Sequence, residues 1–344
     1  MRRFIPLLII ALVATIAILG VLPGCDELVT NESFDSTTII VRDSTCVAFC
    51  HSDISNTMDI EISRWENSAH AREELVDTAI LGQNSRQCGP ECHSTEGFVR
   101  SITGNNIDTV LYTEIGCFAC HAPHTNWDFS VRDTSSVALE NGSSYSYNKS
   151  NICARCHKSL NSQAELVLET TTIDDDWVRW AIHGSTQADI LAGSGGYEYP
   201  GKTYVHSQHK TKVISGCYTC HQEYTRGLTM GGHSYNLRQE NIFLLETCNR
   251  SGCHEAIPFQ DFVIAQLQDD FSSKLDSLKL KLIEDSLLDV VTELPINGKQ
   301  ITDKGLTGAL YNYFFVLNDR SRGIHNLTYD TLLIRMSLDY LNVK

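Results

Sequence analysis

The stretch Cys117-Phe118-Ala119-Cys120-His121 decides how this chain is interpreted. Two cysteines separated by two residues, with a histidine directly after the second, form the attachment signature of a c-type haem. The thiols add to the two vinyl groups of the porphyrin, and the adjoining imidazole can then ligate the iron. We therefore predict a covalently bound haem at this stretch.

The same signature recurs along the chain. It is unchanged at 153–157 and 217–221, and the thiols are further apart at 46–51, 88–93 and 248–254. Disulfides, zinc ligands or a thioredoxin-like pair are alternatives for a lone pair of cysteines. However, the chain has only 13 histidines in 344 residues, and one follows the second cysteine of all six pairs. Chance does not explain this, and we predict six haems c.

The predicted haem-binding residues are therefore the following. The attachment cysteines are Cys46, Cys50, Cys88, Cys92, Cys117, Cys120, Cys153, Cys156, Cys217, Cys220, Cys248 and Cys253, and the proximal ligands are His51, His93, His121, His157, His221 and His254.

Seven further histidines can supply the second axial ligands. The distal candidates are His70, His124, His183, His209, His233 and His325, and His206 is expected to be surplus. His124 is one helical turn from His121 and cannot reach the opposite face of the same haem, so we expect it to ligate a neighbour. Iron held by two histidines has no open position, which favours electron transfer over catalysis. The sequence indicates no catalytic residue.

The N-terminus has the features of an export signal. Arg2 and Arg3 precede an apolar run over 4–21, and Leu22-Pro23-Gly24-Cys25 resembles a bacterial lipoprotein cleavage site. An uncleaved membrane anchor is the alternative. The 13 cysteines divide into 12 in the motifs and Cys25, so no thiol is left for a disulfide. We predict a signal peptide over 1–24, lipidation of Cys25 and an extracytoplasmic location facing the periplasm or the cell exterior.

Composition limits the partners and the architecture. The formal net charge of -15 argues against nucleic-acid binding, which requires a basic surface. About 320 residues are too few to surround six haems with separate domains, so the haems are expected to form a shared core. The fold class predicted is mainly α with long loops, with a polar tether over 25–45, a haem-binding core over 46–257 and a helical region over 258–344.

That last region has the clearest periodicity. Apolar residues recur at intervals of three and four from Ile264 to Leu282, which predicts a long helix over 259–287. A second helix is expected over 306–317. A third should begin near Asn326, a good N-cap, with Leu332, Leu333, Met336 and Leu341 facing inward.

Three segments carry a resemblance to a known family. The segment Asp319-Arg320-Ser321-Arg322-Gly323-Ile324-His325-Asn326, followed by Tyr329, Leu332 and Leu333, resembles the C-terminal part of multihaem cytochromes of the ammonia-forming nitrite reductase and hydroxylamine oxidoreductase group. The segments Trp65 to His70 and Gly232-His233-Ser234 are similar to distal-ligand segments of that group. The resemblance implies that these histidines are distal ligands and that long C-terminal helices pack on the haems. The CxxCK motif common at the catalytic haem of the nitrite reductases is absent.

The leading hypothesis is an electron carrier between a membrane donor, such as a quinol-oxidising complex, and a terminal reductase, another cytochrome or an extracellular acceptor. One alternative is a reductase of nitrite, hydroxylamine or a sulfur oxyanion that keeps one iron five-coordinate. Another is a subunit of a haem filament.

Overall fold

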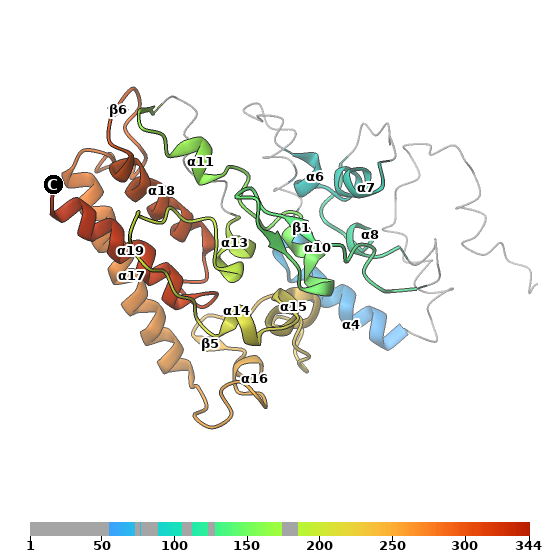
Figure 1. The fold of residues 1–344 in the computed structure, drawn as a ribbon. Helices are drawn as coiled ribbons and strands as arrows, with labels where there is room; N and C mark the ends of the chain where they lie inside the picture. The colour runs from blue at the N-terminus through green and yellow to red at the C-terminus, as the bar shows by residue number, and fades with distance from the viewer. Residues whose placement is uncertain (1–54, 73–75, 77–88, 105–111, 123–127, 174–184) are drawn as a thin grey trace, which may run out of the picture. The chain divides into compact units, whose positions relative to one another are not determined.

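The computed structural model describes residues 55–72, 76, 89–104, 112–122, 128–173 and 185–344. The chain divides into two compact units, of which the first comprises Met1–Ser63 and Asp108–Leu111 and the second Arg64–Ile107 and Tyr112–Lys344. Of the first unit, the structure describes only the start of helix α4 (Ser55–Glu66). The architecture that follows is that of the second unit (Figure 1).

Short helices and long connections make up the first part of the second unit. Its helical elements are η1 (Ala69–Ala71), α6 (Pro90–His93), α7 (Thr95–Thr103), α8 (Cys117–Cys120), η3 (Asn148–Ser150), α10 (Asn151–Ala154), α11 (Gln163–Leu166), α13 (Gln187–Ala192), α14 (His209–Lys212), α15 (Cys217–His221), η5 (Gly232–Ser234) and α16 (Leu245–Cys248). None of the helices in the described ranges is long and apolar enough to cross a bilayer.

The strands of the described residues form three antiparallel pairs of two residues each. The pairs are β1 (Val137–Ala138) with β2 (Ser144–Tyr145), β3 (Thr171–Thr172) with β6 (Gln300–Ile301), and β4 (Arg238–Gln239) with β5 (Ile242–Phe243). The first pair lies inside 133–151, a stretch rich in Ser and Asn. This small strand content agrees with the predicted mainly α class.

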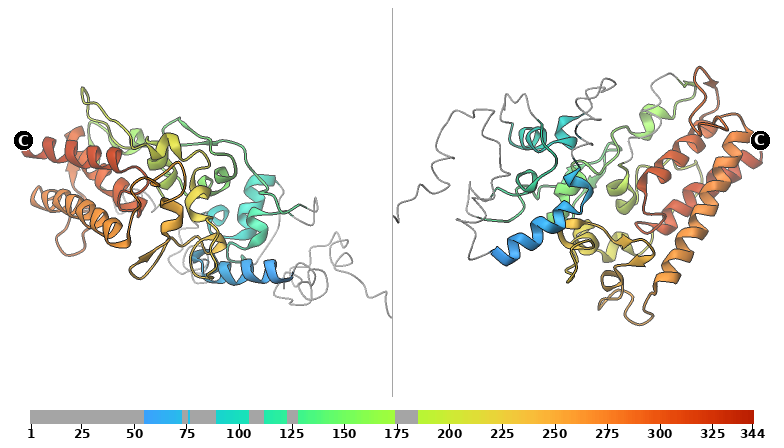
Figure 2. Two further views of the ribbon diagram at one scale, coloured as in Figure 1. Left: turned by 90° about the horizontal axis from the view of Figure 1, so that it is seen from below. Right: turned by 180° about the vertical axis from the view of Figure 1, so that it is seen from behind.

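Three long helices form the C-terminal part. They are α17 (Asp261–Glu284), α18 (Lys304–Asp319) and α19 (Leu327–Asn342), which pack against one another and are drawn in orange and red in Figures 1 and 2. The three helices expected from the periodicity are therefore confirmed. Asn326 is the N-cap of α19 as predicted, and its side chain accepts a hydrogen bond from the backbone N–H of Tyr329.

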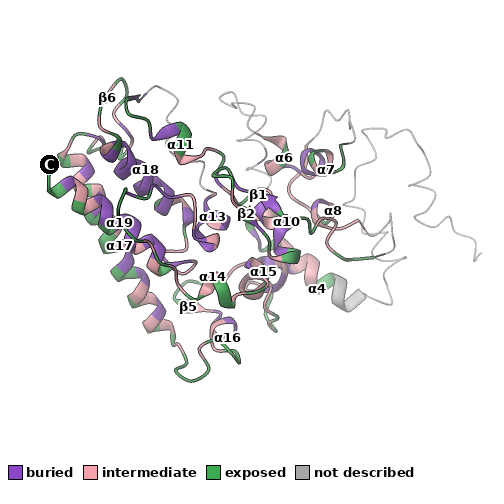
Figure 3. Ribbon diagram, in the orientation of Figure 1, coloured by how far each residue is buried: buried purple, intermediate pink, exposed green. Residues whose placement is uncertain are grey.

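The main hydrophobic core joins these helices to earlier parts of the chain. All four residues expected to face inward from α19 are buried, and Leu278 and Phe315 have no exposed surface. Ile190 of α13 and the nearby Tyr197 and Tyr199 belong to the same cluster. Figure 3 shows the buried faces of α18 and α13 in purple. The C-terminal helices thus share one core with residues that precede position 258.

Candidate haem centres

The short motifs are wound into single helical turns. In two of them the backbone N–H of the histidine donates to the carbonyl of the first cysteine, from His121 to Cys117 and from His157 to Cys153, each at 2.9 Å. Residues three apart on a helix lie on the same side, so both thiols of a turn face one way. The turn therefore presents two thiols and an imidazole together, as covalent attachment of a porphyrin requires.

The stretched motif at 248–254 closes in the same way. The backbone N–H of His254 donates to the carbonyl of Cys248 at 3.2 Å, although two more residues separate them than in the short motifs. The extra residues form a turn in which Cys253 N–H donates to Arg250 O at 3.1 Å. This turn accommodates the two extra residues, so the backbone N–H of His254 makes the same hydrogen bond as the histidine of a short motif.

Four motif histidines lie opposite a predicted distal histidine. The ring-centroid distances are 6.2 Å for His157 and His70, 6.1 Å for His121 and His233, 6.4 Å for His221 and His325, and 6.2 Å for His254 and His209. No two histidines of one pair are neighbours in the sequence. The pairs are therefore products of the tertiary fold.

These distances fit a metal ion held between two imidazoles. Metal–nitrogen bonds of about 2.0 Å on opposite sides of one ion, with a ring radius of about 1.1 Å at each end, separate the two centroids by about 6.2 Å. Rings in direct contact would be closer, as His254 and Phe259 are at 4.2 Å. All four pairs have the separation that bis-histidine ligation needs.

Hydrogen bonds at Nδ1 orient several of these rings. Nδ1 lies 2.7 Å from the carbonyl of Tyr235 in His221, 2.7 Å from that of Ile324 in His209, and 3.2 Å from that of Ser130 in His121. Because a carbonyl can only accept, Nδ1 carries the proton and Nε2 keeps its lone pair. Metal-binding histidines are held in this way by a carbonyl or carboxylate on the other ring nitrogen.

The charge state of two of these rings, His70 and His221, is also suitable. Burial lowers the pKa of His70 to about 4, and a smaller effect of His157 acts in the same direction. Burial likewise lowers the pKa of His221 to about 4. Both imidazoles are therefore neutral near pH 7, which is the form that binds a metal.

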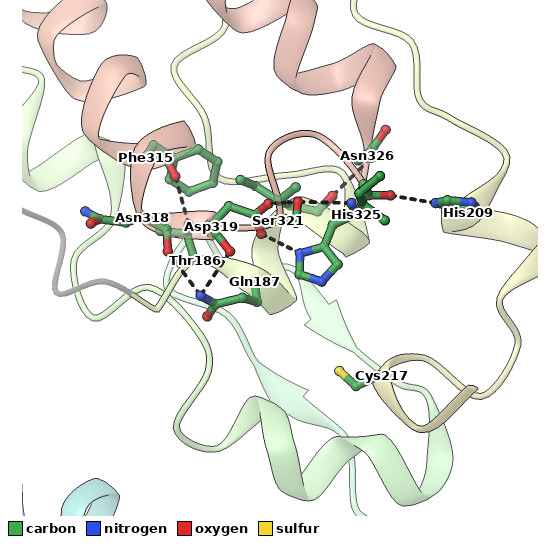
Figure 4. A network of polar contacts seen from close by, with 12 residues as sticks. Thr186, Gln187, His209, Cys217, Phe315, Asn318, Asp319, Ser321, His325 and Asn326 are labelled. Atoms are coloured by element: carbon green, nitrogen blue, oxygen red, sulfur yellow. Dashed lines mark hydrogen bonds and ion pairs between the residues drawn. The ribbon is translucent and has the colours of Figure 1, made fainter. Parts of the chain in front are cut away.

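His325 is positioned by the chain between α18 and α19. Its Nδ1 donates to Oδ1 of Asp319 at 2.5 Å, and its backbone N–H donates to Oγ of Ser321 at 3.2 Å. The end of α18 is fixed in turn by α13, since Thr186 Oγ1 donates to the carbonyl of Phe315 at 2.8 Å. Figure 4 shows the His325 ring pointing toward Cys217, the first thiol of the facing motif. Asp319 belongs to the family-like segment 319–326, and nothing in its sequence context indicates that it holds His325.

His233 follows two glycines, Gly231 and Gly232, that the local backbone and packing require. In the structure both have positive φ, and a Cβ at Gly231 would lie 2.3 Å from the carbonyl oxygen of Glu223. A Cβ at Gly232 would meet the side chain of buried Arg64 at 3.0 Å. The glycines therefore allow contacts within the chain that place His233.

Tyr235 contacts three of the four pairs, which nothing in the sequence indicated. Its ring is edge-on to His70 at 5.0 Å and to His233 at 6.1 Å, and its carbonyl accepts the hydrogen bond from His221. The residue has a φ of 57°, a conformation that costs non-glycine residues free energy. The unusual backbone is what directs ring and carbonyl toward different sites.

The predicted attachment sites lie next to one another. The thiol of Cys92 is within hydrogen-bonding reach of Cys156, and that of Cys153 is within reach of Cys217. Helices α15 and α16, which carry parts of the next two motifs, pack together. The motifs that begin at 88, 153, 217 and 248 therefore follow one another in space. Tyr235 connects the motif at 117 to that at 153, because its ring contacts the histidines that lie opposite both motifs.

Several predicted site residues cannot be compared in this way. Outside the described residues lie Cys25, Cys46, Cys50, His51, Cys88, His124 and His183. His93 ends α6, and its thiol neighbour Cys92 is half-buried. His206, expected to be surplus, packs on the ring of Tyr329 at 5.2 Å, on the core side of the C-terminal helices.

The chain was compared with known proteins. No family model matches it, and no curated protein has a significant similarity to it. Among solved structures, it is similar to the crystal structure of the outer cell wall cytochrome OcwA, with 18% sequence identity and a TM-score of 0.51. The similarity covers 82% of this chain and 50% of that protein, so the chain spans about half of the length of OcwA. In its fold, this chain therefore resembles part of an outer cell wall cytochrome.

Proposed function

We propose that the protein is an extracytoplasmic hexahaem c-type cytochrome that transfers electrons between a membrane donor and a terminal reductase or an extracellular acceptor. The observation that carries the proposal is the set of four histidine pairs at 6.1 to 6.4 Å, each with one member in an attachment motif. The fold similarity to a cytochrome supports the same assignment.

The chain's residues account for the main requirements of such a site. Haem iron, when bound, supplies reversible one-electron transfer. Each cysteine pair would hold the porphyrin covalently, and each histidine pair would occupy both axial positions of its iron. Groups such as the Tyr235 carbonyl keep the imidazoles in one tautomer and orientation. Saturated coordination excludes substrate and limits rearrangement between oxidation states, both of which suit electron transfer.

The two motifs outside these pairs complete the proposed ligand set by elimination. Their proximal ligands are His51 and His93, and the unassigned distal candidates are His124 and His183. We assign His124 and His183 as the distal ligands of the haems whose proximal ligands are His51 and His93. This assignment leaves His206 without a haem.

The neighbouring attachment sites support conduction through the chain. Thiols of successive motifs lie within hydrogen-bonding reach of each other, so porphyrins attached to them would be close together. The proposed path runs from the motif at 88 through those at 153 and 217 to the motif at 248. The motif at 117 joins at 153.

Location and partners follow from the sequence features. We propose a lipid anchor at Cys25 that holds the protein on a bacterial membrane, facing the periplasm or the cell exterior. An acidic surface with a net charge of -15 is suited to cationic or neutral redox partners, such as a quinol-oxidising complex, a terminal reductase or another cytochrome. The segments around His70, His233 and His325 also support a relationship to the nitrite reductase and hydroxylamine oxidoreductase group.

Carbon monoxide titration of the reduced protein would test the proposal. Intact mass should show six haems per chain, and the parent protein should bind no carbon monoxide, because no iron is open. His70→Ala should keep six haems and gain one binding site per chain, whereas the matched control His206→Ala should gain none. Binding by the parent protein would favour the reductase alternative, and absence of haem would refute the proposal.

A further inference from the structure

The hydrogen bond from His325 to Asp319 differs chemically from those of the other oriented rings. His121, His209 and His221 donate to neutral backbone carbonyls. His325 donates to a carboxylate, at 2.5 Å. The side chain of Asp319 is only 1% exposed, so water does not screen the interaction.

The carboxylate of Asp319 lies in buried surroundings. A second carboxyl group, that of Asp330, is buried nearby, and neither of its oxygens has a hydrogen-bond partner among the described residues. Burial, together with the repulsion from Asp319, raises the pKa of Asp330 well above its usual value. Asp319 is further held by Ser321, whose Oγ donates to its second oxygen.

We propose that Asp319 lowers the reduction potential of the haem held by His221 and His325. A carboxylate that accepts the Nδ1 proton makes the imidazole more electron-rich, which raises its basicity as a ligand. An electron-rich axial ligand stabilises ferric over ferrous iron. No proton is transferred, and the only change on reduction is one electron gained by the iron. The inference rests on the proposed function.

The position of the site gives this tuning a consequence for conduction. The motif at 217 lies between those at 153 and 248 along the proposed path. Lowering the potential at this site would make it harder for electrons to pass between the motifs at 153 and 248 in either direction.

A potentiometric titration of the holoprotein, followed by its visible spectrum, would test this inference. Asp319→Asn keeps an acceptor for His325 but removes the charge, and one of the six one-electron steps should shift to a more positive potential. A tenfold change in the ferric to ferrous ratio corresponds to about 59 mV, and we expect a shift of about that size. Asp319→Glu should restore a low potential. Asp330→Asn, a buried and uncharged replacement that does not touch His325, should leave all six steps unchanged.

Ser321→Ala provides a test in the opposite direction. Without the hydroxyl, Asp319 becomes a stronger acceptor for His325, and the same step should move to a more negative potential. The affected step is identified by the low-spin paramagnetic resonance signal that disappears in His325→Ala. If Asp319→Asn and Ser321→Ala both retain six low-spin haems with unchanged potentials, the inference is wrong while the proposed function stands. A chain without haem would refute both.

Discussion

Replacement of His325 by alanine should have two separate effects. It should open one coordination position on an iron, and it should lower the free energy of unfolding. The variant should retain six haems, because attachment depends on the cysteines, and it should bind one carbon monoxide per chain after reduction. It also leaves the carboxylate of Asp319 buried at 1% exposure with Ser321 as its remaining side-chain partner. Removing one member of a buried pair costs about 3 kcal/mol or more.

The double variant His325→Ala/Asp319→Ala separates the two effects. Both variants lose the same iron ligand, so the difference between their free energies of unfolding reports the buried carboxylate alone. The double variant should be the more stable of the two by about 2 kcal/mol, because it leaves no unpaired charge. Urea unfolding of the holoprotein, followed by far-ultraviolet circular dichroism, measures this difference.

Two results would refute the reasoning. If His325→Ala bound no carbon monoxide, His325 would not be an axial ligand, and His206 would become the next candidate. If the double variant were no more stable than the single one, the Asp319 charge would not be buried as the structure has it. His206→Ala is the control, since it removes a half-buried imidazole that packs on Tyr329 and should open no iron.

Three further predictions concern other parts of the molecule. The ring planes of His209 and His254 are nearly perpendicular, at 85°, whereas those of the other pairs are at 51° to 56°. This site should therefore give a more anisotropic low-spin paramagnetic resonance signal, which His209→Ala should abolish. A uniform set of signals would contradict the prediction. Burial, which outweighs the hydrogen bond from the Ser159 N–H, raises the pKa of Asp189 from 3.8 to about 6. The protonated carboxyl group therefore contributes its full stabilisation below about pH 4, and this contribution is lost as the pH rises through 6. The total loss in the free energy of unfolding is about 3 kcal/mol. Urea unfolding between pH 4 and 8 should show this loss in the parent and a weaker pH dependence in Asp189→Asn; equal slopes would argue against a buried charge. Cys25→Ser should release the protein from membranes with its haem content unchanged, and retention on the membrane after export would indicate the uncleaved anchor instead.

Local sequence patterns predicted the features that depend on local physics. The helix α17 follows from the spacing of residues such as Phe271 and Leu278, and the start of α19 follows from the capping side chain of Asn326. The six predicted attachment motifs are recognisable because covalent haem attachment requires cysteine and histidine to be adjacent. Each of these signals lies within a few residues of the structure that it specifies.

The features that the sequence did not predict depend on contacts between distant residues. Which distal histidine faces which motif is set by the packing of loops, as with Arg64, whose Nε donates to the carbonyl of Gly227 at 3.2 Å. Strand β3 pairs with β6 across more than 120 residues, and two-residue strands have no detectable alternation. The role of Asp319 requires knowing that its carboxylate is buried beside His325.

The turn at Tyr235 has a consequence for how the protein matures. Because one residue touches histidines of three sites, these sites cannot acquire their final geometry independently. A chain that has received some but not all of these haems would leave the turn without part of its support, and the histidines of the sites already filled would be misaligned. Loading of the three proposed sites is therefore expected to be cooperative.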